Sequence, residues 1–228
     1  MDFSDILASS IHDIKNSLGL ILNDLDELIA NPANHLANPR QASLLQHEAQ
    51  RANSNLIQLL NLYKLGTAEL VARIAEQNLD EFLDEVVAEN QALCQALNLD
   101  LSATSDPDLI GYFDTDLIHG VLNSTIGNAR RYARERILLS AETVDDYLVI
   151  RVEDDGSGFP GKLPQWLPDD NEPARNLTDP TSDPSRTRLG LYFAARIAQM
   201  HKTPERTGRI RLANGHTLTG GCFELWLP

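Results

Sequence analysis

One histidine near the start of the chain has neighbours that could make it reactive. His12 stands in the stretch SSIHDIKNSLGL, with Asp13 directly after it and Asn16 one helical turn further along the same face. Imidazole titrates near neutral pH and is a nucleophile when neutral, and an adjacent carboxylate can take or orient its proton. An ordinary polar residue on a solvated helix face is the simpler interpretation of this stretch taken alone.

The residues around His12 have the spacing of a helix that packs against another helix. Apolar residues recur in alternating steps of four and three, at Leu7, Ile11, Ile14, Leu18, Ile21, Leu25 and Leu28. Two prolines and three asparagines at 31–40 predict a loop, and a second apolar seam follows from Leu45 to Tyr63. Because such a hairpin cannot bury its own apolar stripe, we expect two copies to form a dimeric four-helix bundle.

Composition narrows the class of protein. The net charge is -14, so the overall field repels nucleic acid and anionic membranes, and neither is expected as a partner. Cys94 and Cys222 are far apart in apolar surroundings, which indicates buried free thiols in a reducing compartment. No apolar run approaches the roughly 20 residues of a membrane span. The first ten residues lack the basic region of a signal peptide. We therefore expect a cytoplasmic protein.

After Gly66 the pattern changes to a mixture of strands and helices. Helices are predicted at 79–96, 116–134 and 189–201, and strands at 69–75, 99–103, 109–113, 136–141, 147–153, 210–214 and 222–227. The two types do not alternate strictly, which favours an α/β sandwich with a mixed sheet over a doubly wound fold. The stretch 162–187 carries five prolines and predicts a long mobile loop, and loops of this length are usually functional.

Four separated motifs occur in a recognisable order. They are HDIKN at 12–16, STIGNARRY at 124–132, DDGSG at 154–158 and RLGLYFAARIAQMH at 188–201. Each is weak alone, but together they resemble a bacterial two-component sensor histidine kinase over nearly the whole chain. Residues 1–66 resemble the dimerisation and histidine-phosphoacceptor hairpin. Residues 70–228 resemble the Bergerat-fold ATP-binding domain, the HATPase domain of that family.

The resemblance implies a role for each residue of the first motif. His12 would be the phosphoacceptor, whose imidazole nitrogen attacks the γ-phosphate of ATP. Asp13 would take or orient the imidazole proton, and Asn16 would position water for hydrolysis of a phosphorylated response regulator. The implied partners are a response regulator receiver domain and a second copy of this chain.

The resemblance also implies an ATP–Mg²⁺ site in the second domain. Asn128 would ligate Mg²⁺ through its amide oxygen, Arg131 would meet the phosphates, and Tyr132 would stack on adenine. Asp154 would accept a hydrogen bond from the adenine amino group. The glycines of DDGSG would let the backbone pass close to the base; they are Gly156 and Gly158.

The phosphate end of this site departs from the family pattern. Gly190 and Leu191 would begin a helix whose amides face the phosphates. The glycine-rich box before that helix reads RTRLG, with Arg186 and Arg188 where glycines are usual. Arginine side chains restrict the backbone and occupy space near the triphosphate, but they also add cations that can bind phosphate. Two smaller departures are Ser124 in place of asparagine and Ser17 in place of proline.

These departures leave other functions open. The chain could be a histidine phosphotransferase that kept the kinase fold but lost ATP binding, and the altered glycine-rich box favours this. Retention of DDGSG, Asn128 and Tyr132 favours nucleotide binding instead. Two further alternatives are an Asn16-dependent phosphatase for one regulator and an anti-sigma kinase of the wider ATPase superfamily. The N-terminal HDIKN hairpin argues against the last of these.

Overall fold

The computed structural model describes residues 3–30, residue 34, part of 41–60, and residues 71–160 and 189–228. Side chains at 3–10, 12, 26, 30 and 189 are not among those described. The chain divides into two compact units, Met1–Leu70 and Val71–Pro228, and each is treated by itself. The predicted loop at 162–187, with Arg186 in it, and Arg188 lie outside the described residues.

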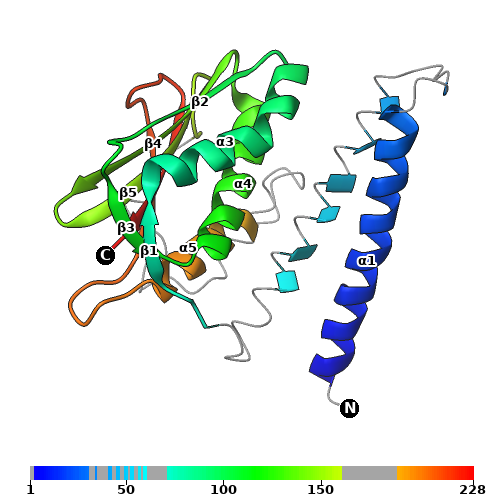
Figure 1. Ribbon diagram of the computed structural model, residues 1–228, viewed down its shortest axis with the longest axis horizontal. Coiled ribbons are helices and arrows are strands. Elements are labelled where there is room, and N and C mark those ends of the chain that lie inside the picture. Colours follow the sequence, from blue (N-terminus) through cyan, green and yellow to red (C-terminus); the bar gives the residue numbers. More distant parts are fainter. Residues whose placement is uncertain are drawn as a thin grey trace. The chain divides into compact units, whose positions relative to one another are not determined.

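The described residues of the first unit include a long helix, α1 (Phe3–Ala30) (Figure 1). Ile11 is 3% exposed, as expected for the apolar seam. The helix continues through Ser17, whose hydroxyl donates to the carbonyl of Asp13 at 3.0 Å, a bond typical of serine inside a helix. The described residues within 41–60 are helical, and the antiparallel hairpin remains a prediction. None of the described helices is long and apolar enough to cross a membrane.

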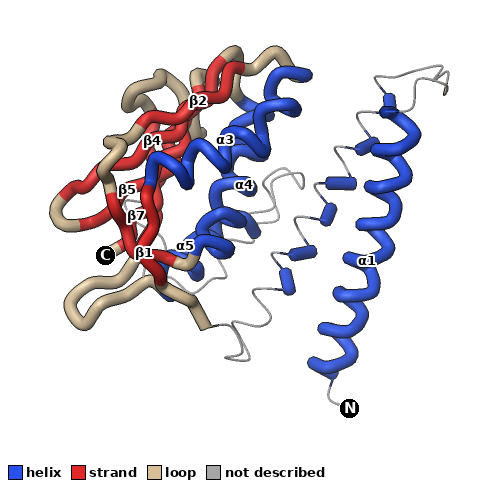
Figure 2. The backbone as a smooth tube through the Cα atoms, viewed as in Figure 1, coloured by secondary structure: helices blue, strands red, loops and turns tan. Residues whose placement is uncertain are grey.

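The second unit is a layered α/β domain with a five-stranded sheet (Figure 2). Its strand order is β2-β4-β5-β7-β6, with β2 parallel to β4 and the other pairs antiparallel. The mixed sheet predicted from the sequence is therefore confirmed. β1 and β3 form a separate antiparallel pair. The elements are β1 (Ala75–Asn78), α3 (Leu79–Ala96), β2 (Asp100–Thr104), β3 (Ile110–Phe113), α4 (Thr115–Tyr132), β4 (Arg136–Val144), β5 (Tyr147–Asp154), α5 (Leu189–Met200), β6 (Arg209–Asn214) and β7 (Gly221–Leu227).

Local signals explain where these elements begin. Asn78 caps α3, because its side-chain oxygen accepts from the amide of Glu81 at 3.0 Å. Asp114 caps α4 in the same way through the amide of Leu117. The strand predicted at 69–75 is wrong in position, since β1 begins only at Ala75 and pairs with β3. The ends of β1 are set by its pairing with β3. The weak alternation of apolar residues at 69–75 did not predict them.

The two faces of the sheet differ in chemistry. Side chains alternate between faces along each strand, so Ile150, Val152 and Asp154 of β5 share the face that contacts α4. The apolar residues on this face and on the helices make the core; the largest that are fully buried include Ile118, Ile137, Leu139, Phe193, Ile197 and Phe223. The free thiols Cys94 and Cys222 are buried, as predicted.

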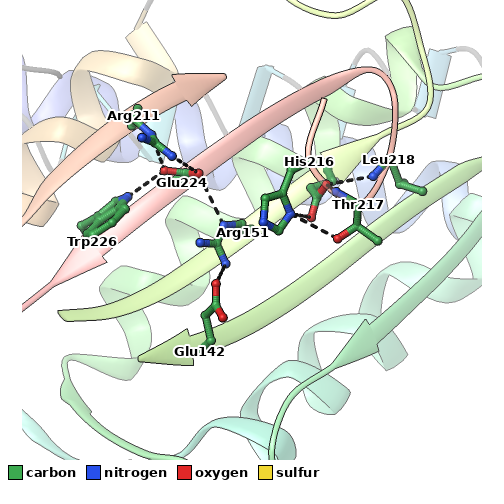
Figure 3. A network of polar contacts seen from close by, with 9 residues as sticks. Glu142, Arg151, Arg211, His216, Thr217, Leu218, Glu224 and Trp226 are labelled. Atoms are coloured by element: carbon green, nitrogen blue, oxygen red, sulfur yellow. Dashed lines mark hydrogen bonds and ion pairs between the residues drawn. The ribbon is translucent and has the colours of Figure 1, made fainter. Parts of the chain in front are cut away.

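The opposite face carries a buried network of charges (Figure 3). Glu224 is 1% exposed and accepts from Arg211 at 2.6 and 2.7 Å and from the Trp226 indole at 2.9 Å. Arg151, 5% exposed, bridges Glu224 and Glu142. Burial alone would raise the pKa of the Glu224 carboxyl, but hydrogen bonds from Arg211 and Trp226 outweigh it and hold the pKa below its usual value. The charges are tolerated because they are paired.

His201 joins the end of α5 to the start of α4. It is 2% exposed, its Nδ1 lies 2.8 Å from the carbonyl of Ile197, and its Nε2 lies 3.0 Å from the amide of Asp114. A backbone amide can only donate, so Nε2 accepts and the proton sits on Nδ1. Burial lowers the pKa of this imidazole, against smaller effects of Ile197 and Asp114. The folded protein therefore requires neutral His201.

This requirement makes stability depend on pH. Below the ordinary histidine pKa of about 6.5, His201 binds a proton in the unfolded chain but not in the folded protein. The free energy of unfolding therefore decreases as the pH falls toward the lowered pKa of the folded state. Above about pH 6.5 the effect vanishes. We expect wild type to lose up to about 1.4 kcal/mol per pH unit more than His201→Gln, measured by urea unfolding with tryptophan fluorescence at pH 7.5, 6.5 and 5.5. Parallel pH profiles for the two proteins would contradict this assignment.

Candidate functional site

The end of α4 presents polar side chains to solvent. Leu122, Ile126 and Ala129 are buried along its inner side, and the helix ends at Tyr132. Asn128 and Arg131 are exposed, and Tyr132 is 44% exposed. The second predicted motif is therefore on an accessible helix end, where its side chains can meet a ligand.

The DDGSG motif begins at Asp154, the last residue of β5, and packs directly on that helix end. A Cβ built on Gly156 would lie 2.0 Å from the carbonyl oxygen of Tyr132, so no larger residue fits there. Asp155 accepts from the amides of Arg134 and Glu135 at 2.8 and 3.1 Å. Burial would raise the pKa of Asp155, but these backbone amides hold it below its usual value. The structure thus brings the second and third motifs together.

Asp154 is the buried carboxylate of this site. It is 7% exposed, and its Oδ1 accepts from the amides of Gly156 at 2.8 Å and Gly221 at 3.3 Å. Its backbone carbonyl accepts from the amide of Gly220 at 2.9 Å. Within the described part of the chain, no hydrogen bond engages Oδ2. This oxygen is the acceptor that Asp154 can offer to a ligand.

Two features of the hairpin between β6 and β7 complete the site, and the sequence interpretation missed both. Gly220 is packed so closely that a Cβ would lie 2.4 Å from Oδ1 of Asp154. Asn214 accepts from the amide of Phe159 at 2.7 Å and donates to its carbonyl at 2.9 Å. Gly158 has φ +76, and a Cβ there would meet the Asn214 side chain at 2.7 Å. In the sequence, Asn214 was only the last residue of the strand predicted at 210–214.

The remaining predicted residues lie elsewhere. Gly190 and Leu191 are in the first turn of α5 and are partly buried. His12, Asp13 and Asn16 lie on α1, in the other unit. Asp13 and Asn16 are exposed, while the His12 side chain is not among those described. Arg188 is outside the described residues. Within the described part of the second unit, the observed contacts join the end of α4 and the DDGSG motif into one local site.

Comparison with known proteins identifies this architecture. The model of the histidine kinase-, DNA gyrase B- and HSP90-like ATPase family matches residues 113–228, just over half of the chain. The sensor protein kinase PilS of Pseudomonas aeruginosa is 25% identical over 229 residues. That match covers 96% of this chain and 39% of PilS, so the chain spans about two fifths of that relative's length.

Solved structures agree on the fold. Full-length ShkA in complex with AMPPNP superposes with a TM-score of 0.62 at 19% identity, over 97% of this chain and 44% of that one. The Acinetobacter baumannii histidine kinase AdeS gives a TM-score of 0.57 at 16% identity, over 95% and 96% of the two chains. The predicted Bergerat-type domain is confirmed. The similarity to PilS agrees with the resemblance of its motif order to two-component histidine kinases. The chain belongs to the histidine kinase-, DNA gyrase B- and HSP90-like ATPase family.

Proposed function

We propose that this protein is a histidine-kinase-like signalling protein that phosphorylates His12 from ATP–Mg²⁺ and passes the phosphoryl group to a response regulator. The observation that carries the nucleotide part is the buried Asp154, with Oδ1 held by two backbone amides and Oδ2 left to accept. Such a carboxylate suits the exocyclic amino group of adenine. Tyr132 would stack on the base, and its exposure and the packing of its backbone carbonyl against Gly156 support this role.

The magnesium ion is expected to arrive with the nucleotide. Among the described residues no group of three or more His, Cys, Asp or Glu side chains could hold a metal ion. Asn128 offers one exposed amide oxygen, which fits Mg²⁺ held mainly by phosphate oxygens and water. When bound, the ion neutralises charge on the phosphates. Arg131 and the arginines Arg186 and Arg188 would add cations beside them.

The phosphoryl transfer falls to the first motif. A neutral imidazole nitrogen of His12 attacks the γ-phosphorus, the bond to the ADP oxygen breaks, and a nitrogen–phosphorus bond forms. Asp13, exposed and next in the chain, takes or orients the proton on the other nitrogen. Transfer onward to a regulator aspartate regenerates the imidazole. Asn16, exposed one turn away, would position water in the reverse, phosphatase direction.

Nucleotide binding tests the first part. ATP–Mg²⁺ at 100 times its Kd should stabilise wild type by about 2.7 kcal/mol in thermal unfolding. Asp154→Asn replaces one of the two carboxylate oxygens with an NH2 group, which donates and cannot accept. Because the adenine amino group then loses its acceptor, the variant should bind ATP at least about tenfold more weakly. Asp84→Asn, which removes an exposed carboxylate from α3, is the matched control and should bind as wild type does. No stabilisation of wild type at millimolar ATP would refute nucleotide binding.

That negative outcome would favour the alternative function, a histidine phosphotransferase or regulator phosphatase without ATP. The observation in its favour is Arg186 and Arg188 at positions where glycine is usual. In that case His12 receives its phosphoryl group from one receiver domain and gives it to another.

Radiolabelling tests the role of His12. Incubation with γ-labelled ATP and Mg²⁺ should label wild type and His47→Gln, and leave His12→Gln unlabelled. The label should be lost in acid, because a phosphoramidate nitrogen becomes a good leaving group when protonated. If only a phosphorylated receiver domain labels wild type, the phosphotransferase alternative replaces the kinase. Label that persists in His12→Gln excludes His12 as the acceptor.

We also propose that α1 supports a homodimer. Ile14, Ile21 and Leu28 recur every seven residues and are 52, 50 and 42% exposed within one chain. An exposed apolar stripe at heptad spacing suits a partner helix, and a second copy supplies one by symmetry.

Sedimentation velocity tests this association. Ile21→Asp places a charge in the stripe and should shift the protein toward monomer. Asn23→Asp introduces the same charge on an exposed position off the stripe and should leave the sedimentation coefficient unchanged. A wild type that sediments as a monomer at micromolar concentration would contradict the dimer.

A further inference from the structure

Glu153 lies directly before Asp154 but faces the other side of the sheet. Strand alternation sends Asp154 toward the helices and Glu153 to the charged face, where it pairs in register with Cys222 of β7 and Leu138 of β4. Glu153 is 0% exposed. A fully buried carboxylate is costly, so its partners indicate what it does.

Among the described residues, the hydrogen-bond partners of the Glu153 carboxylate belong to the hairpin between β6 and β7. Oε2 accepts from the amides of Thr217 at 2.7 Å and Leu218 at 3.0 Å. Oε1 lies 3.0 Å from Nδ1 of His216. These three residues lie close together in Figure 3, with the His216 ring and the amides of Thr217 and Leu218 bonded to the carboxylate. One carboxylate therefore fixes three consecutive residues of the hairpin.

The next residues of the same hairpin bind Asp154. After Leu218 the chain reaches Gly220, whose amide donates to the Asp154 carbonyl, and Gly221, whose amide donates to Oδ1. Only Thr219 separates the segment held by Glu153 from the segment that holds Asp154. Adjacent acids on opposite faces thus act on one hairpin.

We propose that Glu153 is a positioning residue that sets the orientation of the Asp154 carboxylate, and with it adenine selectivity, through the hairpin 215–221. This inference rests on the proposed nucleotide site. With Glu153 in place, Gly221 holds Oδ1 and Oδ2 points its lone pairs at the ligand. Without Glu153, residues 216–218 lose their anchor, and the Gly221 contact at 3.3 Å weakens with them.

Other charged or titratable groups also line this part of the outer face. They are His216 of the hairpin, Arg151 of β5, and Cys222 and Glu224 of β7. Burial raises the pKa of the Cys222 thiol to about 12, with the Glu153 and Glu224 carboxylates adding to it, so Cys222 stays protonated and adds no charge beside Glu153.

Glutamine is the conservative replacement at position 153. Its carbonyl oxygen can still accept from the amides of Thr217 and Leu218, whereas alanine removes every contact that the carboxylate makes with the hairpin. Glu153→Gln should therefore hold the hairpin better than Glu153→Ala.

The experiment measures ADP and inosine diphosphate binding to the full chain by calorimetry. Inosine has a carbonyl oxygen in place of the adenine amino group, so the ratio of the two Kd values reports contact with Asp154. Glu153→Ala should lower ADP affinity roughly tenfold and bring the ratio toward one. The matched control is Glu142→Ala. It removes a carboxylate on the same face of the sheet that pairs with Arg151 and does not bind a hairpin amide, so it should keep the wild-type ratio.

Glu153→Gln should recover most of the wild-type ratio of the two Kd values, because its carbonyl oxygen still accepts from the hairpin amides. An unchanged selectivity ratio in Glu153→Ala would overturn the inference. If wild type itself binds no ADP, the proposed nucleotide site fails instead. Amide exchange at 216–221 in the unliganded protein then decides whether Glu153 anchors the hairpin, since Glu153→Ala should speed this exchange relative to wild type and Glu142→Ala should not.

Discussion

The arrangement of the second unit depends on close backbone packing around the Asp154 carboxylate. Gly156 lies against the last carbonyl of α4, and Gly220 lies against Asp154 itself, at distances that no Cβ can share. Three segments far apart in sequence therefore meet with only backbone between them. Because of this packing, backbone amides bind one oxygen of the Asp154 carboxylate and leave the other for a ligand. Side-chain substitution does not remove a backbone amide.

The sheet supplies this contact because its two faces have different tasks. The inner face packs α4 and α5 through aliphatic and aromatic side chains, so the end of β5 is placed against the end of α4. The outer face is held by paired charges centred on Glu224 and Arg151. Because side chains alternate, Glu153 and Asp154 belong to different faces and act on the same hairpin from opposite sides. The outer face thereby contributes to the geometry of the inner one.

The two ends of the proposed nucleotide site differ in how closely they follow the family. The base end retains a buried carboxylate, the glycines around it and an exposed tyrosine. At the phosphate end, Arg186 and Arg188 replace glycines, exchanging backbone freedom for positive charge. Loss of nucleotide binding would remove the reason for the costly glycine packing at the base end. This asymmetry supports a nucleotide-binding protein whose phosphate contacts use side chains more than backbone.

Local patterns were enough to predict much of the fold. The bounds of α3 follow from its apolar period and the cap at Asn78, and the strands from Arg136 and Tyr147 follow from alternation around the turn at Asp145 and Asp146. The order of four motifs predicted the family. Each of these signals is carried by residues close in sequence, so no knowledge of distant contacts was needed.

Contacts between distant segments were decided only by the tertiary structure. The position of β1 was set by pairing with β3, whereas the alternation at 69–75 predicted a strand too early in the chain. Asn214 and Glu153 each looked like the last residue of a predicted strand, because their roles depend on Phe159 and on residues 216–218, which are remote in sequence. The sequence by itself determined which chemical groups the site contains. The tertiary structure decided which backbone amides orient them, since a hydrogen bond between remote segments leaves no periodic trace in the chain.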